Sequence, residues 1–152
     1  MGSNMGNSQQ QINTATQLIE KKIGKIIRQS ALYKTAAWGN TSQPDFLNQV
    51  IIVETTFAAA ETLGAILLIE KKMGRIRTIK NAPRIIDIDI LFFNKEIIHQ
   101  KNLSVPHPEI TNRRFVLIPL NELVPALLHP VLKKTMHQLL IDCTDTLDVK
   151  KF

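Results

Sequence analysis

Residues 85–93 (IIDIDILFF) constrain the fold of this chain most strongly. They are an apolar, β-branched run that predicts a strand, yet the run contains two aspartates, Asp87 and Asp89. Residues two apart on a strand point to the same face, so the two carboxylates are expected side by side. Because like charges repel and buried unpaired charge is costly, a cation should compensate them. That cation is either a divalent metal ion or the side chain of Arg84. Alternatively, the two aspartates lie at an exposed sheet edge, where solvent compensates their charge.

Basic side chains gather just before this strand, in a chain whose formal net charge is +6. Between 71 and 84 the sequence has no acid, and its basic residues are Lys71, Lys72, Arg75, Arg77, Lys80 and Arg84. Such a run is typical either of a solvated face or of a surface that binds an anionic partner. That partner could be nucleotide phosphates, nucleic acid or a membrane surface. Cations beside a metal-binding acid pair suit phosphoryl transfer, because both neutralise phosphate oxygens. The sequence GxxxxGK[ST] is missing, which excludes a P-loop.

The apolar pattern of the whole chain predicts one domain over 1–152. We expect helices over about 8–23, 58–73 and 135–141, and strands over 26–33, 46–55, 85–93 and 96–99. With one more strand in front, this order is βαββαβ, a ferredoxin-like α+β sheet with its helices on one face. Few residues precede the first helix, so we expect that first strand to be missing or shortened. Prolines predict an irregular stretch farther on, at Pro106, Pro108 and Pro119.

The composition also restricts the setting of the protein. Its one cysteine, Cys143, can form neither an intramolecular disulfide nor a cysteine zinc site, which favours a reduced, cytoplasmic compartment. No run of about 18 apolar residues is present, so we expect no transmembrane helix. The polar, Gln-rich start is also unlike a signal peptide.

Two further groups of residues are candidates for ligand binding. His107 lies between two prolines that fix its backbone, and Arg113 follows it, so a phosphate contact is a hypothesis beside the commoner structural role of a histidine. Phe46 and Asn48 share one face of a predicted strand. There a ring beside an amide can stack on a flat heterocycle and read its edge, although a core phenylalanine and an edge asparagine would give the same spacing.

Together these residues resemble a known family. The motifs in chain order are GSN at 2–4, YKT at 33–35, QPDFLN at 43–48, Glu70 with Gly74-Arg75, PRxxDxDIL at 83–91, VPHP at 105–108 and NRRFVL at 112–117. The combination is similar to the 6-hydroxymethyl-7,8-dihydropterin pyrophosphokinases of folate biosynthesis, from Gly2 to about Pro125. The resemblance implies an ATP-dependent kinase that transfers pyrophosphate to the hydroxymethyl group of the pterin and releases AMP. We also expect a monomer without nucleic-acid or membrane partners.

The resemblance implies residues for each part of the reaction. The implied catalytic residues are Asp87, Asp89, Arg75 and Arg84. The two aspartates among them would bind two magnesium ions. Contacts to the ATP phosphates are implied for Arg75, Arg84, His107 and Arg113, and Glu70 is implied to lie near the nucleotide. Contacts to the pterin are implied for Thr35 and Asn48 at its edge and for Phe46 and Phe115, whose rings would sandwich it. Trp38, which departs from the family pattern, is expected to share in the stacking. Residues 75–83 would form a lid over both substrates.

Departures from the family pattern leave alternatives open. The first strand is reduced, the lid lacks a tryptophan, and Trp38 stands where the family often has a smaller aliphatic residue. One alternative is a catalytically weak or inactive relative. Another is a ferredoxin-like nucleic-acid-binding module, although aromatic residues are only 5% of the chain. A third is a two-metal nucleotidyltransferase, which would release pyrophosphate instead of AMP.

Overall fold

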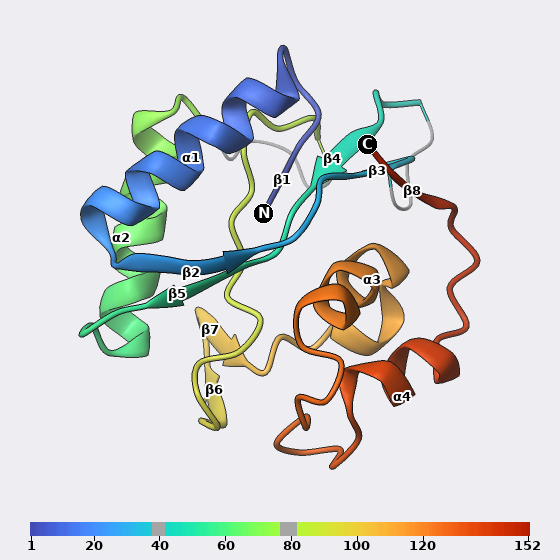
Figure 1. The fold of residues 1–152 in the computed structure, drawn as a ribbon. Coiled ribbons are helices and arrows are strands. Elements are labelled where there is room, and N and C mark those ends of the chain that lie inside the picture. Colours follow the sequence, from blue (N-terminus) through green and yellow to red (C-terminus); the bar gives the residue numbers. More distant parts are fainter. Residues whose placement is uncertain (38–41, 77–81) are drawn as a thin grey trace.

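The structure, a computed structural model, describes residues 1–37, 42–76 and 82–152. Its helices are α1 (Ser8–Lys22), α2 (Ala59–Lys72), the 3-10 turn η1 (Ile110–Asn112), α3 (Arg114–Leu123) and α4 (Met136–Asp142). Its strands are β1 (Gly2–Ser3), β2 (Lys25–Gln29), β3 (Tyr33–Thr35), β4 (Phe46–Asn48), β5 (Ile51–Glu54), β6 (Ile98–Gln100), β7 (Leu103–Val105) and β8 (Val149–Lys151) (Figure 1). None of these helices is long and apolar enough to cross a membrane. The predicted mixture of helices and strands is confirmed.

The strands of the described residues pair antiparallel, in three sheets. One sheet has the order β1-β4-β3-β8, and β2-β5 and β6-β7 form two-stranded sheets. The predicted strands 26–33 and 46–55 are therefore each divided in two. At the break, Ser30 Oγ accepts the N–H of Val50 at 3.0 Å, and Gln49 Nε2 donates to the Ser30 carbonyl at 2.8 Å. The backbone bond from Ser30 N–H to the Val50 carbonyl remains at 2.9 Å, and these side-chain bonds supplement it where the chain passes from one sheet to the next.

The sequence predicted that the first strand is missing or shortened, and the structure shows that it is shortened. β1 has only two residues and pairs with β4, Gly2 opposite Asn48. On its other side Gly2 N–H donates to the Asp87 carbonyl at 2.9 Å, and Asp87 N–H donates to the Gly2 carbonyl at 2.8 Å. Two residues are enough to hold β1 in the sheet, because both of its edges form backbone hydrogen bonds.

The prediction of a regular strand over 85–93 is wrong. Among the described residues of this segment, only Asp87 forms a bridge, because β1 ends after two residues and offers no longer partner. The segment is extended, and other groups satisfy its backbone. Ile88 N–H donates to a Glu70 carboxylate oxygen at 2.9 Å, and the Leu91 carbonyl accepts from His107 N–H at 2.9 Å.

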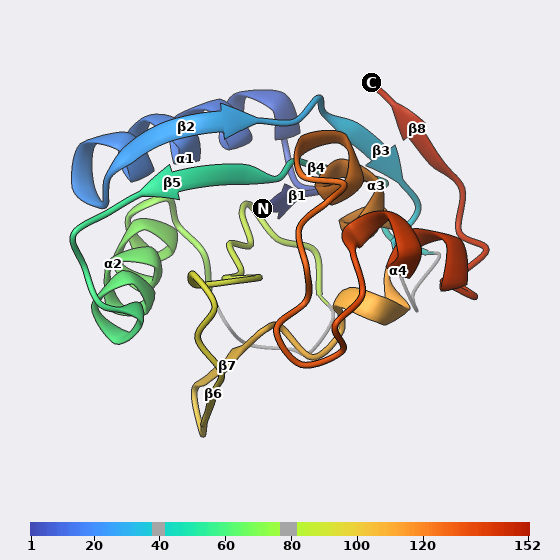
Figure 2. The same ribbon diagram turned by 60° about the horizontal axis from the view of Figure 1, so that its bottom comes forward.

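Two pairs of helices cover the strands from opposite sides. Ile51 and Val53 of β5 pack with α1 and α2, whereas Ile52 packs with α3 and α4. Successive residues of a strand point to opposite faces, so the pairs lie on different faces of β5. Figures 1 and 2 both show α1 with α2 well apart from α3 with α4. The expectation of helices on one face therefore holds only for α1 and α2.

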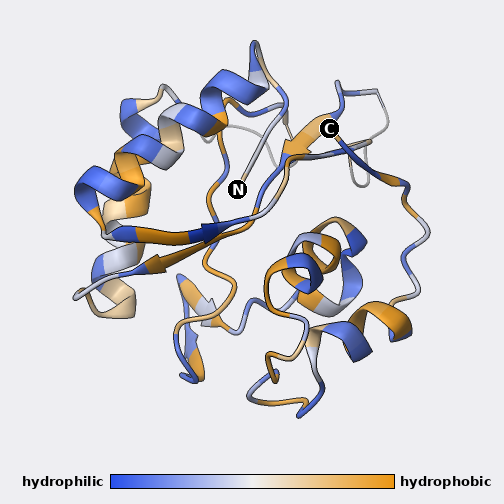
Figure 3. Ribbon diagram, in the orientation of Figure 1, coloured by the Kyte–Doolittle hydropathy of each residue, from blue (hydrophilic) through white to orange (hydrophobic). Residues whose placement is uncertain are grey.

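The three predicted helices are confirmed, within a few residues at their ends. Asn7 Oδ1 accepts the N–H of Gln10 at 3.1 Å and caps α1, and Thr135 caps α4 in the same way through Gln138. Apolar residues of α1 recur at helical spacing, and the buried ones are Ile12, Ala15 and Ile19. Figure 3 shows the alternation of apolar and polar stretches along this helix.

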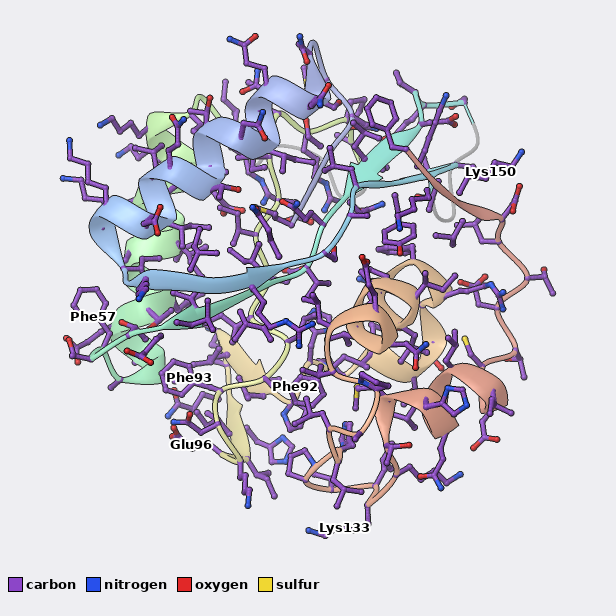
Figure 4. All side chains as sticks on the ribbon, in the orientation of Figure 1. Phe57, Phe92, Phe93, Glu96, Lys133 and Lys150 are labelled. Carbon is purple, nitrogen blue, oxygen red and sulfur yellow. The ribbon has the colours of Figure 1, made fainter. Side chains whose placement is uncertain are left out.

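α3 is a helix where prolines had predicted irregular chain. Pro119 lies inside it and has no N–H to give to the carbonyl of Phe115. Burial offsets this loss, because Leu117, Leu120 and Leu123 lie on one stripe and pack in the core with α4. The neighbouring Phe92 packs with that core, whereas Phe93 packs toward β6 and β7 (Figure 4).

Candidate active site

One cavity gathers most of the residues that the sequence singled out. The predicted site residues on its wall are Thr35, Phe46, Asn48, Arg84, Asp87, Asp89, His107, Arg113 and Phe115. They come from β3, β4, the segment after 82, the loop that follows β7, and the start of α3. Trp38 and residues 77–81 of the predicted lid lie outside the described residues.

The wall formed by β3, β4 and α3 suits a flat heterocycle. Asn48 is buried, and its Nδ2 donates to the hydroxyl of Thr35 at 3.2 Å. Phe46 and Phe115 line the same cavity, and the guanidinium carbon of Arg113 lies 5.9 Å from the centre of the Phe115 ring. Rings beside a fixed amide and hydroxyl can stack on a heterocycle and bond its polar edge.

The part of the cavity on the other side of β1 from β4 is charged. Asp87 accepts from two guanidinium groups, Arg75 Nη1 at 2.5 Å on one oxygen and Arg84 Nη1 on the other. Burial alone would raise the pKa of Asp87, but Arg84 and Arg75 outweigh it and lower the pKa below its ordinary value. Asp87 is therefore a carboxylate held between two cations, so pairing with arginine, one of the alternatives from the sequence, is present.

Glu70 and Arg75 lie behind Asp87, and neither is among the residues that line the cavity. Glu70 is 2% exposed and accepts from Arg75 Nη1 at 2.5 Å and from Ile88 N–H at 2.9 Å. Arg75 thereby bridges two carboxylates, with only 10% of its side chain exposed. Contact of these two residues with ATP stays a prediction.

His107 presents a defined face to the cavity. Its Nδ1 accepts the N–H of Glu109 at 3.1 Å, so the proton of the neutral ring is assigned to Nε2. The preceding peptide bond, Val105–Pro106, is cis. A neutral His107 can therefore donate a hydrogen bond from Nε2 to an anion.

Sequence reasoning gave too little weight to Gly2 and Asn4. Gly2 lines the cavity between Asn48 and Asp87. Asn4 Oδ1 accepts the N–H of Arg84 at 2.8 Å, and its Nδ2 donates to the Pro44 carbonyl at 3.1 Å. The available signal was the small polar run GSN before the first helix, which we used only as a motif of the family resemblance.

The donors present fit a magnesium ion that is shared with a phosphate ligand. Within 1–37, 42–76 and 82–152, no three histidine, cysteine or acidic residues gather into a self-contained metal centre. Asp87 and Asp89 both line the cavity, and magnesium needs only one or two carboxylates when phosphates and water complete its shell.

Rings, an amide and a hydroxyl that share one cavity with carboxylates, arginine and histidine are the groups expected of an enzyme that transfers a phosphorus-containing group to a heterocyclic acceptor. Comparison with known proteins gives the family. Residues 1–125 match the sequence model of 7,8-dihydro-6-hydroxymethylpterin-pyrophosphokinase, HPPK. The chain belongs to this family.

Individual relatives agree with this assignment. The chain is 38% identical over 138 residues to 2-amino-4-hydroxy-6-hydroxymethyldihydropteridine pyrophosphokinase of Aquifex aeolicus, covering 91% of this chain and 86% of the relative. It is also 38% identical over 131 residues to folic acid synthesis protein fol1 of Pneumocystis carinii, covering 86% of this chain but only 18% of that longer protein. A solved Plasmodium falciparum HPPK-DHPS structure with pteroate has the same fold, with a TM-score of 0.76 at 22% identity, over 93% of this chain and 41% of that one.

Proposed function

We propose that this chain transfers the pyrophosphoryl group of ATP to the hydroxymethyl group of 6-hydroxymethyl-7,8-dihydropterin in folate biosynthesis, giving AMP and the pterin diphosphate. Family membership supports the reaction class. The observation that carries the proposal is a single cavity with Asn48 and Thr35 on one wall and Asp87, Asp89 and His107 on the other. A heterocyclic alcohol and a polyphosphate can lie there with their reacting ends together.

The acceptor would lie against β3 and β4. Asn48 and Thr35 would bond the polar edge of the pterin, and Phe46 and Phe115 would stack on its faces, because all four line the cavity. We keep the sequence-based proposal that Trp38 shares this stacking.

ATP would lie along the charged wall. Arg84, His107 and Arg113 line the cavity and would bind the phosphate oxygens. Asp87 and Asp89 would hold two magnesium ions. When bound, magnesium neutralises charge on the phosphate oxygens.

Arg75 and Glu70 would act from behind this wall. Arg75 Nη1 already contacts both carboxylates at 2.5 Å, so it could turn from Asp87 toward a phosphate while Glu70 still holds it. On this view Arg75 is catalytic, and Glu70 serves ATP binding through Arg75.

In the reaction, the hydroxymethyl oxygen attacks the β-phosphorus, and the bond from that phosphorus to the oxygen bridging the α-phosphate breaks. AMP leaves with that oxygen, and the hydroxyl proton passes to solvent. The arginines stabilise the charge on the transferred group, and Asn48 keeps the attacking arm in position. His107 would donate from Nε2, because its Nδ1 accepts the N–H of Glu109.

The test is to combine the protein with ATP, magnesium and reduced hydroxymethylpterin and to resolve the nucleotides. AMP formed only in the presence of the pterin is the expected result. Release of pyrophosphate would indicate the nucleotidyltransferase alternative, and absence of turnover together with salt-sensitive RNA binding would indicate the nucleic-acid-binding one. Absence of both activities would indicate an inactive relative.

We further propose that the protein works as a monomer in the cytoplasm, without a nucleic-acid or membrane partner. One cavity holds candidate residues for both the pterin and the phosphates, so the proposed reaction needs no residue from a second copy. Light scattering at the assay concentration should give a mass near 17.2 kDa.

A further inference from the structure

Gly2 lies at the centre of the candidate active site, between the two walls of the cavity. It is opposite Asn48 on one side and opposite Asp87 on the other, and all three residues line the cavity. Residues opposite one another in neighbouring antiparallel chains point to the same face. Asn48, Gly2 and Asp87 therefore form one row that runs from one wall of the cavity to the other, and Gly2, in the middle, is the member without a side chain.

Gly2 of β1 and Asn48 of β4 form a non-hydrogen-bonded pair of the antiparallel ladder. Met1 and Gln49 exchange both of their backbone hydrogen bonds, at 2.8 and 2.9 Å, so the next pair, Gly2 with Asn48, exchanges none. In such non-hydrogen-bonded pairs the Cα atoms are only about 4.5 Å apart and the side chains lie closer together. Any side chain on residue 2 would therefore meet Asn48.

The space at Gly2 confirms the conflict. A Cβ built there lies 2.5 Å from Oδ1 of Asn48, whereas the nearest backbone atom, the carbonyl oxygen of Leu47, is at an ordinary 3.5 Å. Gly2 is not one of the positive-φ glycines, so alanine can adopt its backbone conformation. Alanine at position 2 would thus displace the Asn48 amide while the strand remained in place.

Gly24 shows the opposite case. A Cβ there would lie 2.0 Å from the backbone carbonyl oxygen of Glu54, so a substitution would force two chain segments apart. At Gly2 the obstacle is a side-chain end that can rotate. The consequence at Gly2 is therefore expected in ligand binding more than in folding.

We propose that Gly2 is a specificity-determining position of the acceptor subsite. Its missing side chain keeps the Asn48 amide directed at the heterocycle and leaves the floor between Asn48 and Asp87 open for the hydroxymethyl arm. This inference rests on the proposed function, because it takes Asn48 as a pterin contact.

The experiment measures pterin binding and ATP binding separately, by calorimetry with a non-hydrolysable ATP analogue, for Gly2→Ala, Asn48→Ala and the double variant. Gly2→Ala should weaken pterin binding about tenfold, which corresponds to about 1.4 kcal/mol. Its affinity for the ATP analogue and its thermal midpoint should stay near those of the wild type. In the double variant, Gly2→Ala should add little to the loss caused by Asn48→Ala, because residues that act through one contact are not additive.

Gly64→Ala is the matched control, since nothing lies within 4 Å of a Cβ at this exposed position of α2. It should bind both ligands like the wild type. Wild-type pterin affinity in Gly2→Ala would overturn the inference, as would an equal loss of both ligands with a lower thermal midpoint. Wild-type pterin affinity in Asn48→Ala would instead show that the proposed pterin site itself is wrong.

Discussion

Replacing Glu70 should reveal how much the buried charge network behind the site contributes to stability. Glu70 accepts from Ile88 N–H and from Arg75, and it is 2% exposed. In Glu70→Ala, a buried Ile88 N–H left unpaired costs about 1–3 kcal/mol, and the lost hydrogen bond to a charged group about 1.5–3 kcal/mol. Arg75 keeps Asp87 as a partner, so we expect the lower half of the combined range, about 3 kcal/mol.

Glu70→Gln separates these two contributions. The amide oxygen can still accept from Ile88 N–H, so only the charged bond to Arg75 is weakened, and about 1.5 kcal/mol should be lost. Urea unfolding without ligands measures both variants. For a chain of this size, about 3 kcal/mol corresponds to a fall in thermal midpoint of about 6–12 °C.

Glu20→Ala is the control, since Glu20 is exposed on α1 and should change stability by less than about 0.5 kcal/mol. The reasoning is refuted if Glu70→Ala is as stable as this control, or if Glu70→Gln costs as much as Glu70→Ala. The first result would mean that the network gives no net stability. The second would mean that Ile88 N–H needs no acceptor.

Three further predictions concern catalysis and pH. Asp89→Ala should abolish AMP formation with an unchanged circular dichroism spectrum, and full activity would remove Asp89 from the metal site. Arg84→Ala should lower kcat about 10²-fold or more, at least ~2.7 kcal/mol, whereas a loss confined to thermal stability would make it only a partner of Asp87. His129 accepts two backbone N–H groups, from Val131 and Leu132, and burial lowers its pKa. Folding thus favours the neutral ring, so His129 contributes its full stability above about pH 6.5, and this contribution falls as the pH drops toward the lower folded pKa. Between pH 8 and 5, the thermal midpoint of the wild type should therefore fall more than that of His129→Gln.

The sequence predicted the helices well because their signals are local. α1 and α4 have capping side chains, and α1 and α2 have apolar residues at helical spacing, which no distant contact has to supply. The candidate site was predictable for a different reason. Polar residues such as Asp87, Asp89 and Asn48 interrupt apolar strand sequence, and a polar group in a core needs a partner or a ligand.

What the sequence could not predict depends on contacts between distant segments. β1 has no apolar alternation, and its strand conformation depends on Asn48 and Asp87 on either side. α3 contains a proline and forms because its leucines pack against α4. β8 has two lysines among its three residues and pairs with β3 across more than a hundred residues of sequence. The burial of Arg75 behind Asp87 likewise follows from the position of Glu70, which no local pattern gives.

The GSN run links the two walls of the site. Gly2 pairs with Asn48 and with Asp87, and Asn4 bonds both the Pro44 carbonyl and the Arg84 N–H. Three consecutive residues thus bind to the chain just before β4 and to the chain around the aspartates, which are about 40 residues apart in sequence. In the proposed function, these backbone and amide hydrogen bonds would fix the distance between the heterocycle on one wall and the phosphates on the other. Pyrophosphoryl transfer needs this constancy, because an acceptor oxygen misplaced by about 1 Å can cost 10²-fold in rate.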